Sequence, residues 1–320
     1  MNIINYSPKS KQIRFFRNIK RKLLHEFRDQ PEMLMNFWDP RDFMSELKKR
    51  QSKNDAVIIS AHGWEDSILR PNQGTFEKTI TINESNLFKN KFVFANSCYT
   101  ARKFGPNLVR EGTFTYVGFD DSISDVFLSE NNYKSTIELI IKKVYTLSIA
   151  EAITSFIKKC LTAKEFCEYI DFHFRKNINA VNKMSIKELN KQFQISIPND
   201  SQKLKSLIKL EFIEKSKILK GKISLLGEEN YINWKYIHSL SEEELYKRLE
   251  KIELVSDKNL LYKLFIKATI FLVLDDKANY LKTIQEFSET LEKEDDSTEL
   301  FELPYDLSGD FDELKDSLAG

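Results

Sequence analysis

A histidine and a cysteine stand at the ends of two apolar segments, and these two side chain types together are suited to thiol chemistry. His62 follows the run 55–61, and Cys98 follows the run 91–97. An imidazole beside a thiol produces a good nucleophile, because the thiolate attacks carbonyl carbon far better than the thiol does. The pair therefore predicts a cysteine hydrolase, provided that the fold brings both side chains together.

Both apolar runs have the length and composition of β-strands, and sites in open α/β sheets form where parallel strands end. Gly63 follows His62 directly, so its N–H is unhindered, and we predict that it holds an oxyanion together with the N–H of Cys98. A helix starting after Cys98 would favour the thiolate. The alternatives are a hydrogen-bonded histidine at a strand end and a small buried cysteine.

The surrounding sequence alternates between strand and helix patterns, which predicts an α/β fold with a mostly parallel sheet flanked by helices. Helical patterns dominate beyond about residue 180, and the segment from Ser288 to Gly320 holds 12 acidic and 2 basic residues. We therefore predict a first domain over 1–175, a mainly helical regulatory or partner-binding region over 176–293, and an acidic tail over 294–320. Within the first domain we expect strands over 2–6, 55–61, 75–82, 91–96 and 113–119, and helices over 9–28, 39–50, 101–110, 132–146 and 149–159.

Four short blocks carry a resemblance to a known family: Ser60-Ala-His-Gly63, Ala95-Asn-Ser-Cys98, Tyr116-Val-Gly-Phe119 with the acidic loop after it, and Ser148-Ile-Ala-Glu-Ala-Ile153. In this order they resemble the caspase-like cysteine peptidases, and within that group the branch of separases and bacterial CHAT domains. The resemblance covers roughly residues 50–160. It implies a caspase-like sheet, endopeptidase activity, a Cys98 nucleophile, and His62 as the acid and base. Bacterial members often act as effectors in anti-phage or cell-suicide systems, so such a role is implied too.

The same resemblance suggests where the substrate binds. Asp125 aligns with the residue that faces a basic substrate side chain in the separase branch, and Asp120 and Asp121 lie nearby. Three carboxylates within six residues favour Arg or Lys before the scissile bond by charge complementarity. Asn96 is a further candidate for the pocket wall. The alternatives are a solvated turn with a helix cap and a polar strand end.

Composition and charge narrow the classes of function that remain for this chain. The formal net charge is +1, so no global basic field indicates nucleic acid. The three cysteines form neither an even disulfide framework nor a CxxC zinc motif, and we expect no metal or cofactor. Without a membrane-length apolar run or a signal-peptide pattern, we expect a cytoplasmic protein that acts on a protein substrate. A non-catalytic caspase-like interaction scaffold and a different thiol hydrolase remain alternatives.

Overall fold

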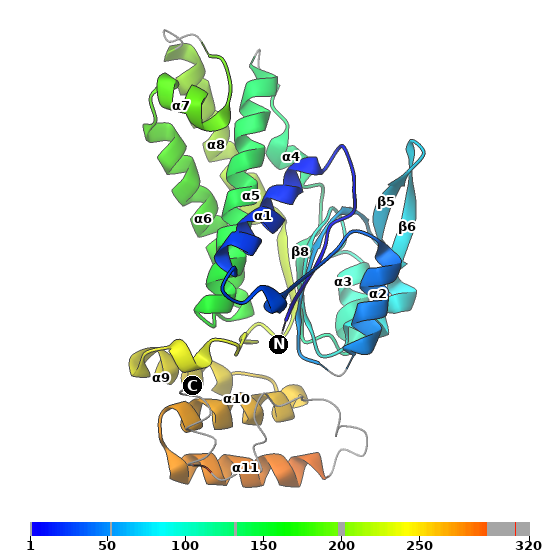
Figure 1. Cartoon of the computed structure of the whole chain (residues 1–320), viewed down its shortest axis with the longest axis vertical. Helices are drawn as coiled ribbons and strands as arrows, with labels where there is room; N and C mark the ends of the chain where they lie inside the picture. Colours follow the sequence, from blue (N-terminus) through cyan, green and yellow to red (C-terminus); the bar gives the residue numbers. More distant parts are fainter. Residues whose placement is uncertain (1, 52, 131–132, 198–201, 293–310, 312–320) are drawn as a thin grey trace.

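The structure is a computed structural model that describes residues 2–51, 53–130, 133–197, 202–292 and 311. A six-stranded sheet lies between two layers of helices, and a further group of helices, α9 to α11, lies beyond one end of the sheet (Figure 1). Within the described residues no helix is long and apolar enough to cross a membrane.

The central sheet has the strand order β2-β1-β3-β7-β8-β9, in which all strands run parallel except β9, which is antiparallel to β8. This confirms the α/β class and the mostly parallel sheet. Ser60 at the end of β3 pairs with Asn96 at the end of β7, so both strands finish at the same level. The strands are β1 (Ile3–Tyr6), β2 (Leu34–Phe37), β3 (Ala56–Ser60), β7 (Phe92–Asn96), β8 (Thr115–Phe119) and β9 (Ile223–Gly227).

Each face of the sheet is covered because the strands are apolar on both sides, as buried parallel strands are. Ile58 and Phe94 pack toward α1, α5 and α6, whereas Val57 and Val93 pack toward α2 and α3. Burying each such side chain contributes about 1.5–3 kcal/mol to the free energy of unfolding, so both helical layers are needed for a stable sheet. The helices are α1 (Arg17–Glu26), α2 (Pro40–Lys49), α3 (Phe104–Arg110), α5 (Lys134–Lys158) and α6 (Ala163–Lys183).

A small antiparallel sheet follows β3 directly and was only partly predicted. It consists of β4 (His62–Trp64), β5 (Ser67–Asn72) and β6 (Thr75–Thr81), of which only the last was expected. His62 therefore begins β4, two residues beyond the end of β3. The short hairpin fixes the direction in which the chain leaves the central sheet at His62.

The chain from residue 134 onward differs from the expected helices and joins the later helices to the central sheet. The helices expected over 132–146 and 149–159 are one helix, α5, because the Ser148 hydroxyl donates to the Val144 carbonyl inside the helix (2.8 Å) and does not cap a new one. The predicted boundary at 175/176 falls inside α6, and β9 completes the central sheet, so the helical region is joined to the first domain. The later helices are α7 (Ile186–Phe193), α8 (Gln202–Lys222), α9 (Glu242–Glu253), α10 (Leu260–Val273) and α11 (Lys277–Leu291).

The helical region also shares the core of the sheet. Tyr231 stacks on Phe92 of β7 with ring centroids 5.8 Å apart, and Tyr262 of α10 stacks on Tyr231 at 5.2 Å. The Tyr262 hydroxyl donates to the carbonyl of Ile232 (2.8 Å), which satisfies it inside the core. The predicted acidic tail over 294–320 lies outside the described residues, apart from Phe311.

Candidate active site

His62 and Cys98 line the same hollow, which has a volume of about 200 Å³. Each lies two residues beyond the paired ends of β3 and β7, so the parallel strands deliver both to one edge of the sheet. Gly63 shows how closely the two segments approach. A Cβ added there would stand 2.5 Å from the Cys98 carbonyl oxygen and 2.9 Å from the Ser97 Cβ, so only glycine permits this contact.

The sulfur of Cys98 is half-buried and accepts a hydrogen bond from the backbone N–H of Ile123, with an N···S distance of 3.3 Å. The expected helix directly after Cys98 is a wrong prediction. A turn follows instead, with Tyr99 at φ +61°, and α3 begins only at Phe104. The Ile123 amide, and not a helix terminus, is therefore the backbone donor that contacts the sulfur.

His62 is half-buried between two side chains. Its Nε2 lies 3.4 Å from the Ser10 hydroxyl, and its ring lies 4.5 Å from the ring of Phe76 on β6. Burial lowers the pKa of His62 below 6.5, so the imidazole is neutral near pH 7 and able to accept a proton. Within the described residues no hydrogen bond joins His62 to Cys98, so both groups face the hollow as separate partners for a bound molecule.

The segments that carry the two predicted oxyanion donors, Gly63 and Cys98, are in contact with each other. In the part of the chain that the structure describes, the Cys98 N–H has no hydrogen-bond acceptor. The turn that holds it is fixed, because the Thr100 hydroxyl donates to the Ser97 carbonyl (3.0 Å) and the Ala101 N–H to the Phe119 carbonyl (3.0 Å). A rigid, unoccupied N–H beside a cysteine is what an oxyanion site needs.

Glu65 connects the turn after His62 with the turn after Cys98 through hydrogen bonds and ion pairs. Its carbonyl accepts the N–H groups of Lys103 (3.1 Å) and Phe104 (2.7 Å). Its carboxylate pairs with Lys103 (2.8 Å) and Arg102 (3.2 Å), and these cations lower its pKa. No sequence motif predicted this link, although the opposite charges of Glu65 and Arg102–Lys103 were a weak signal for it.

The acidic loop after β8 is not open to a ligand in this structure. Lys222, at the end of α8, lies 3.1 Å from the Asp121 carboxylate, contacts the Asp125 carboxylate, and donates to the Ser122 carbonyl at 2.7 Å. The Asp120 side chain is exposed, and among the described residues it has no partner. None of the three carboxylates lines the hollow of His62 and Cys98. The acidic loop predicted to bind a basic side chain of the substrate therefore already holds a lysine of the chain itself.

Asn96 does not face the hollow either, which corrects its predicted role. Its side chain is fully buried, and its Oδ1 accepts a hydrogen bond from the Tyr145 hydroxyl of α5 at 2.6 Å. Burial raises the pKa of Tyr145, so the phenol stays protonated and keeps donating. This hydrogen bond fixes the end of β7 against α5, two residues before Cys98. Tyr145 is a positioning residue that no sequence pattern revealed.

The hollow itself is mainly apolar. Besides His62 and Cys98, its polar members are Gln12, Ser124 and Lys142. An elongated or branched apolar side chain would therefore bury well beside Cys98. The apolar lining comes from the N-terminal segment, from the chain between β3 and β4, and from the segment around α4 (Ser124–Phe127), and consists of Ile13, Phe15, Phe16, Ala61, Ile123, Phe127 and Leu128.

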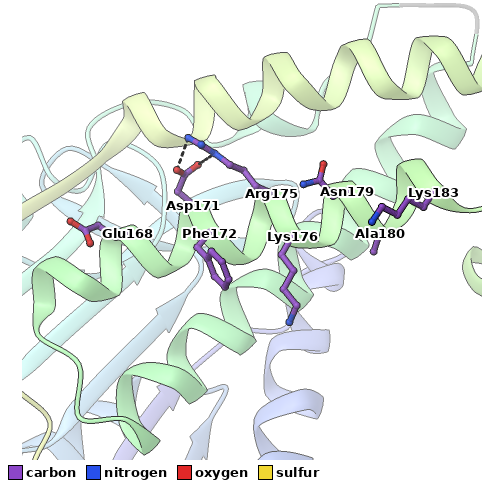
Figure 2. A pocket seen from close by; sticks show the side chains of 8 residues that line it. All are labelled: Glu168, Asp171, Phe172, Arg175, Lys176, Asn179, Ala180 and Lys183. Atoms are coloured by element: carbon purple, nitrogen blue, oxygen red, sulfur yellow. Dashed lines mark hydrogen bonds and ion pairs between the residues drawn. The ribbon is translucent and has the colours of Figure 1, made fainter. Parts of the chain in front are cut away.

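A separate hollow on the outer side of α6 is strongly charged and shares no lining residue with the first (Figure 2). Arg175 and Asp171 form an ion pair within it at 2.7 Å, so these two charges satisfy each other. No group of three or more His, Cys, Asp or Glu residues within the described residues is arranged to hold a metal ion. The hollow of His62 and Cys98 thus remains the candidate active site.

Neither a scan against protein-family models nor a search of curated proteins finds a significant match to this chain.

Proposed function

We propose that this protein is a cysteine endopeptidase with a caspase-like fold, closest to the CHAT and separase branch. The observation that carries the proposal is the convergence of His62 and Cys98 on one hollow, with Gly63 packed against the Cys98 backbone. The order of strands and the mostly parallel sheet are compatible with this fold. The motif resemblance adds support, and it also suggests an effector role in a bacterial anti-phage or cell-suicide system.

In the proposed reaction the Cys98 thiol transfers its proton to His62, and the sulfur attacks the carbonyl carbon of the scissile peptide bond. The N–H groups of Cys98 and Gly63 hold the oxyanion. His62 then gives its proton to the leaving amine, and the C–N bond breaks to leave a thioester. A water molecule, deprotonated by His62, attacks the thioester carbonyl, which releases the acid and restores the Cys98 thiol.

For the substrate we propose a protein segment with a basic residue before the scissile bond, recognised by Asp121 and Asp125. Such a side chain must displace Lys222, which holds both carboxylates. The apolar hollow beside Cys98 would take a neighbouring apolar side chain of the same segment. Lys222 would thus limit cleavage after basic residues until it moves, and a regulatory protein bound to the C-terminal helices is a partner suited to move it.

The test is cleavage of a mixed peptide library by the full chain and by the variants Cys98→Ala and His62→Ala, with Cys167→Ala as the matched control. Cys167 is partly buried on α6, and burial raises the pKa of its thiol to about 12, so it has no part in the proposed chemistry. Library cleavage must disappear in both site variants and persist in the control. If a trigger that activates the wild-type protein in cells also activates both site variants, the non-catalytic scaffold is the correct reading.

A further inference from the structure

A second hollow lies between α1 and α5 and has a volume of about 860 Å³. Arg14, in the 3₁₀ turn η1 (Arg14–Phe16), and Arg17 and Arg21 of α1 reach it from one side. Lys142 and Lys143 of α5 reach it from the other. The spacing of three and four residues puts the arginines on one helical face, so they converge on the same opening.

These cations are poorly balanced by acidic groups. Arg14, Arg17 and Arg21 are exposed, and they form no ion pair with any residue that the structure describes. The only carboxylate in the lining, Glu138, lies 3.4 Å from Lys142 and 3.9 Å from Lys134. The hollow thus gathers five positive side chains around one negative side chain, although the whole chain carries a formal charge of only +1.

Lys143 is a cation of this hollow whose described hydrogen-bond partner is uncharged. Its ammonium donates to the Phe193 carbonyl at 2.7 Å, which is a neutral acceptor. Burial lowers the pKa of Lys143, and no carboxylate among the residues that the structure describes forms an ion pair with it to offset this effect. Keeping Lys143 charged here costs free energy that an anion in the hollow would recover.

We propose that this hollow binds a small polyphosphate, meaning a linear chain of phosphate groups with or without an organic part. Arginine forks hold phosphate oxygens in pairs, and several arginines on one face suit several phosphates. The volume is within the usual range of small-molecule sites. Five of the cations surround one hollow of limited volume, which favours a small ligand over a nucleic acid.

The site is independent of the proposed peptidase activity, yet it borders the catalytic hollow. Phe15 and Lys142 line both hollows. A bound polyphosphate would therefore contact residues that also line the hollow of Cys98.

Isothermal titration calorimetry of the full chain with sodium tripolyphosphate, ATP and adenosine, in metal-free buffer at physiological salt, tests the proposal. Tripolyphosphate and ATP are expected to bind with a Kd of about 100 µM or tighter, and adenosine not at all. Equal affinities would assign recognition to the phosphate chain alone, and tighter binding of ATP would show that the organic part contributes as well.

Arg17→Gln and Arg21→Gln are each expected to weaken tripolyphosphate binding about tenfold, because each removes a charge-assisted donor. Arg110→Gln is the matched control, since this exposed arginine lies on α3 at the opposite face of the sheet, and it should leave the Kd unchanged. The proposal is overturned if the wild-type Kd exceeds about 1 mM, or if all three variants bind alike. It is also overturned if a single-stranded oligonucleotide binds more tightly than tripolyphosphate and depends on the same arginines.

Discussion

Replacing Gly63 by alanine is the substitution that most directly probes how the active site is assembled. The new methyl group would stand 2.5 Å from the Cys98 carbonyl oxygen, 2.8 Å from Thr100 Cγ2 and 2.9 Å from Ser97 Cβ. Ordinary contacts begin at 3.4 Å, so β4 and the Cys98 turn must separate by about 0.9 Å (3.4 minus 2.5). The nearest contact is backbone, so no flexible side chain can simply swing away.

A displacement of about 1 Å between reacting groups typically lowers catalytic rate about 100-fold, and forced overpacking costs about 1–3 kcal/mol of stability. We therefore expect Gly63→Ala to lose about two orders of magnitude in peptide cleavage while remaining folded. The assay is kcat/KM on the best library peptide, together with urea unfolding monitored by circular dichroism.

Gly221→Ala is the matched control for this experiment. Gly221 lies near the end of α8, nothing stands within 4 Å of its added Cβ, and alanine favours a helix over glycine by up to about 1 kcal/mol. This variant should keep full activity and be equally or slightly more stable. If Gly63→Ala behaves like Gly221→Ala in both assays, the close contact between the His62 and Cys98 segments does not exist in solution.

Three further outcomes follow from the site. Lys222→Ala frees Asp121 and Asp125, so cleavage of Arg and Lys reporters should rise severalfold over apolar reporters; an unchanged ratio would remove the acidic loop from substrate recognition. Burial lowers the pKa of His62, so its neutral form persists below pH 6.5, and the acid limb of kcat/KM must lie below that value; a limb above pH 7 would contradict it. Tyr145→Phe leaves the buried Asn96 oxygen without its donor, which should cost about 1–3 kcal/mol in urea unfolding; a loss under about 0.5 kcal/mol would show that the hydrogen bond contributes little.

The central strands could be predicted because each is a self-contained apolar run. β3 and β7 are fully buried, so almost every residue in them is apolar and the pattern needs no partner to be recognised. Their parallel pairing then placed His62 and Cys98 at one edge. β2 and β4 have only four and three residues, which is too short for any periodicity to appear.

Other features could not be predicted, because they depend on contacts that a local sequence pattern does not reveal. Lys222 and Asp125 are 97 positions apart, and neither sequence neighbourhood indicates that a lysine fills the acidic loop. Ser148 precedes Glu151 by three residues, like a helix cap, yet its hydroxyl bonds back to Val144, because the surrounding apolar residues keep α5 continuous. Asn96 was predicted to line the substrate pocket, because its hydrogen bond with Tyr145, 49 positions later in the chain, leaves no trace in the local sequence.

Covalent labelling with a peptidyl acyloxymethyl ketone tests most directly whether Cys98 is a nucleophile that His62 activates. The label is located by intact mass and peptide mapping after reaction at neutral pH. Burial raises the thiol pKa of both Cys160 and Cys167 to about 12, so these two cysteines should stay unlabelled and serve as internal controls. A catalytic dyad of His62 and Cys98 should give a single adduct on Cys98 in the wild-type chain and a much slower reaction in His62→Ala. Equal labelling of all three cysteines, or a Cys98 rate that does not depend on His62, would contradict a catalytic dyad.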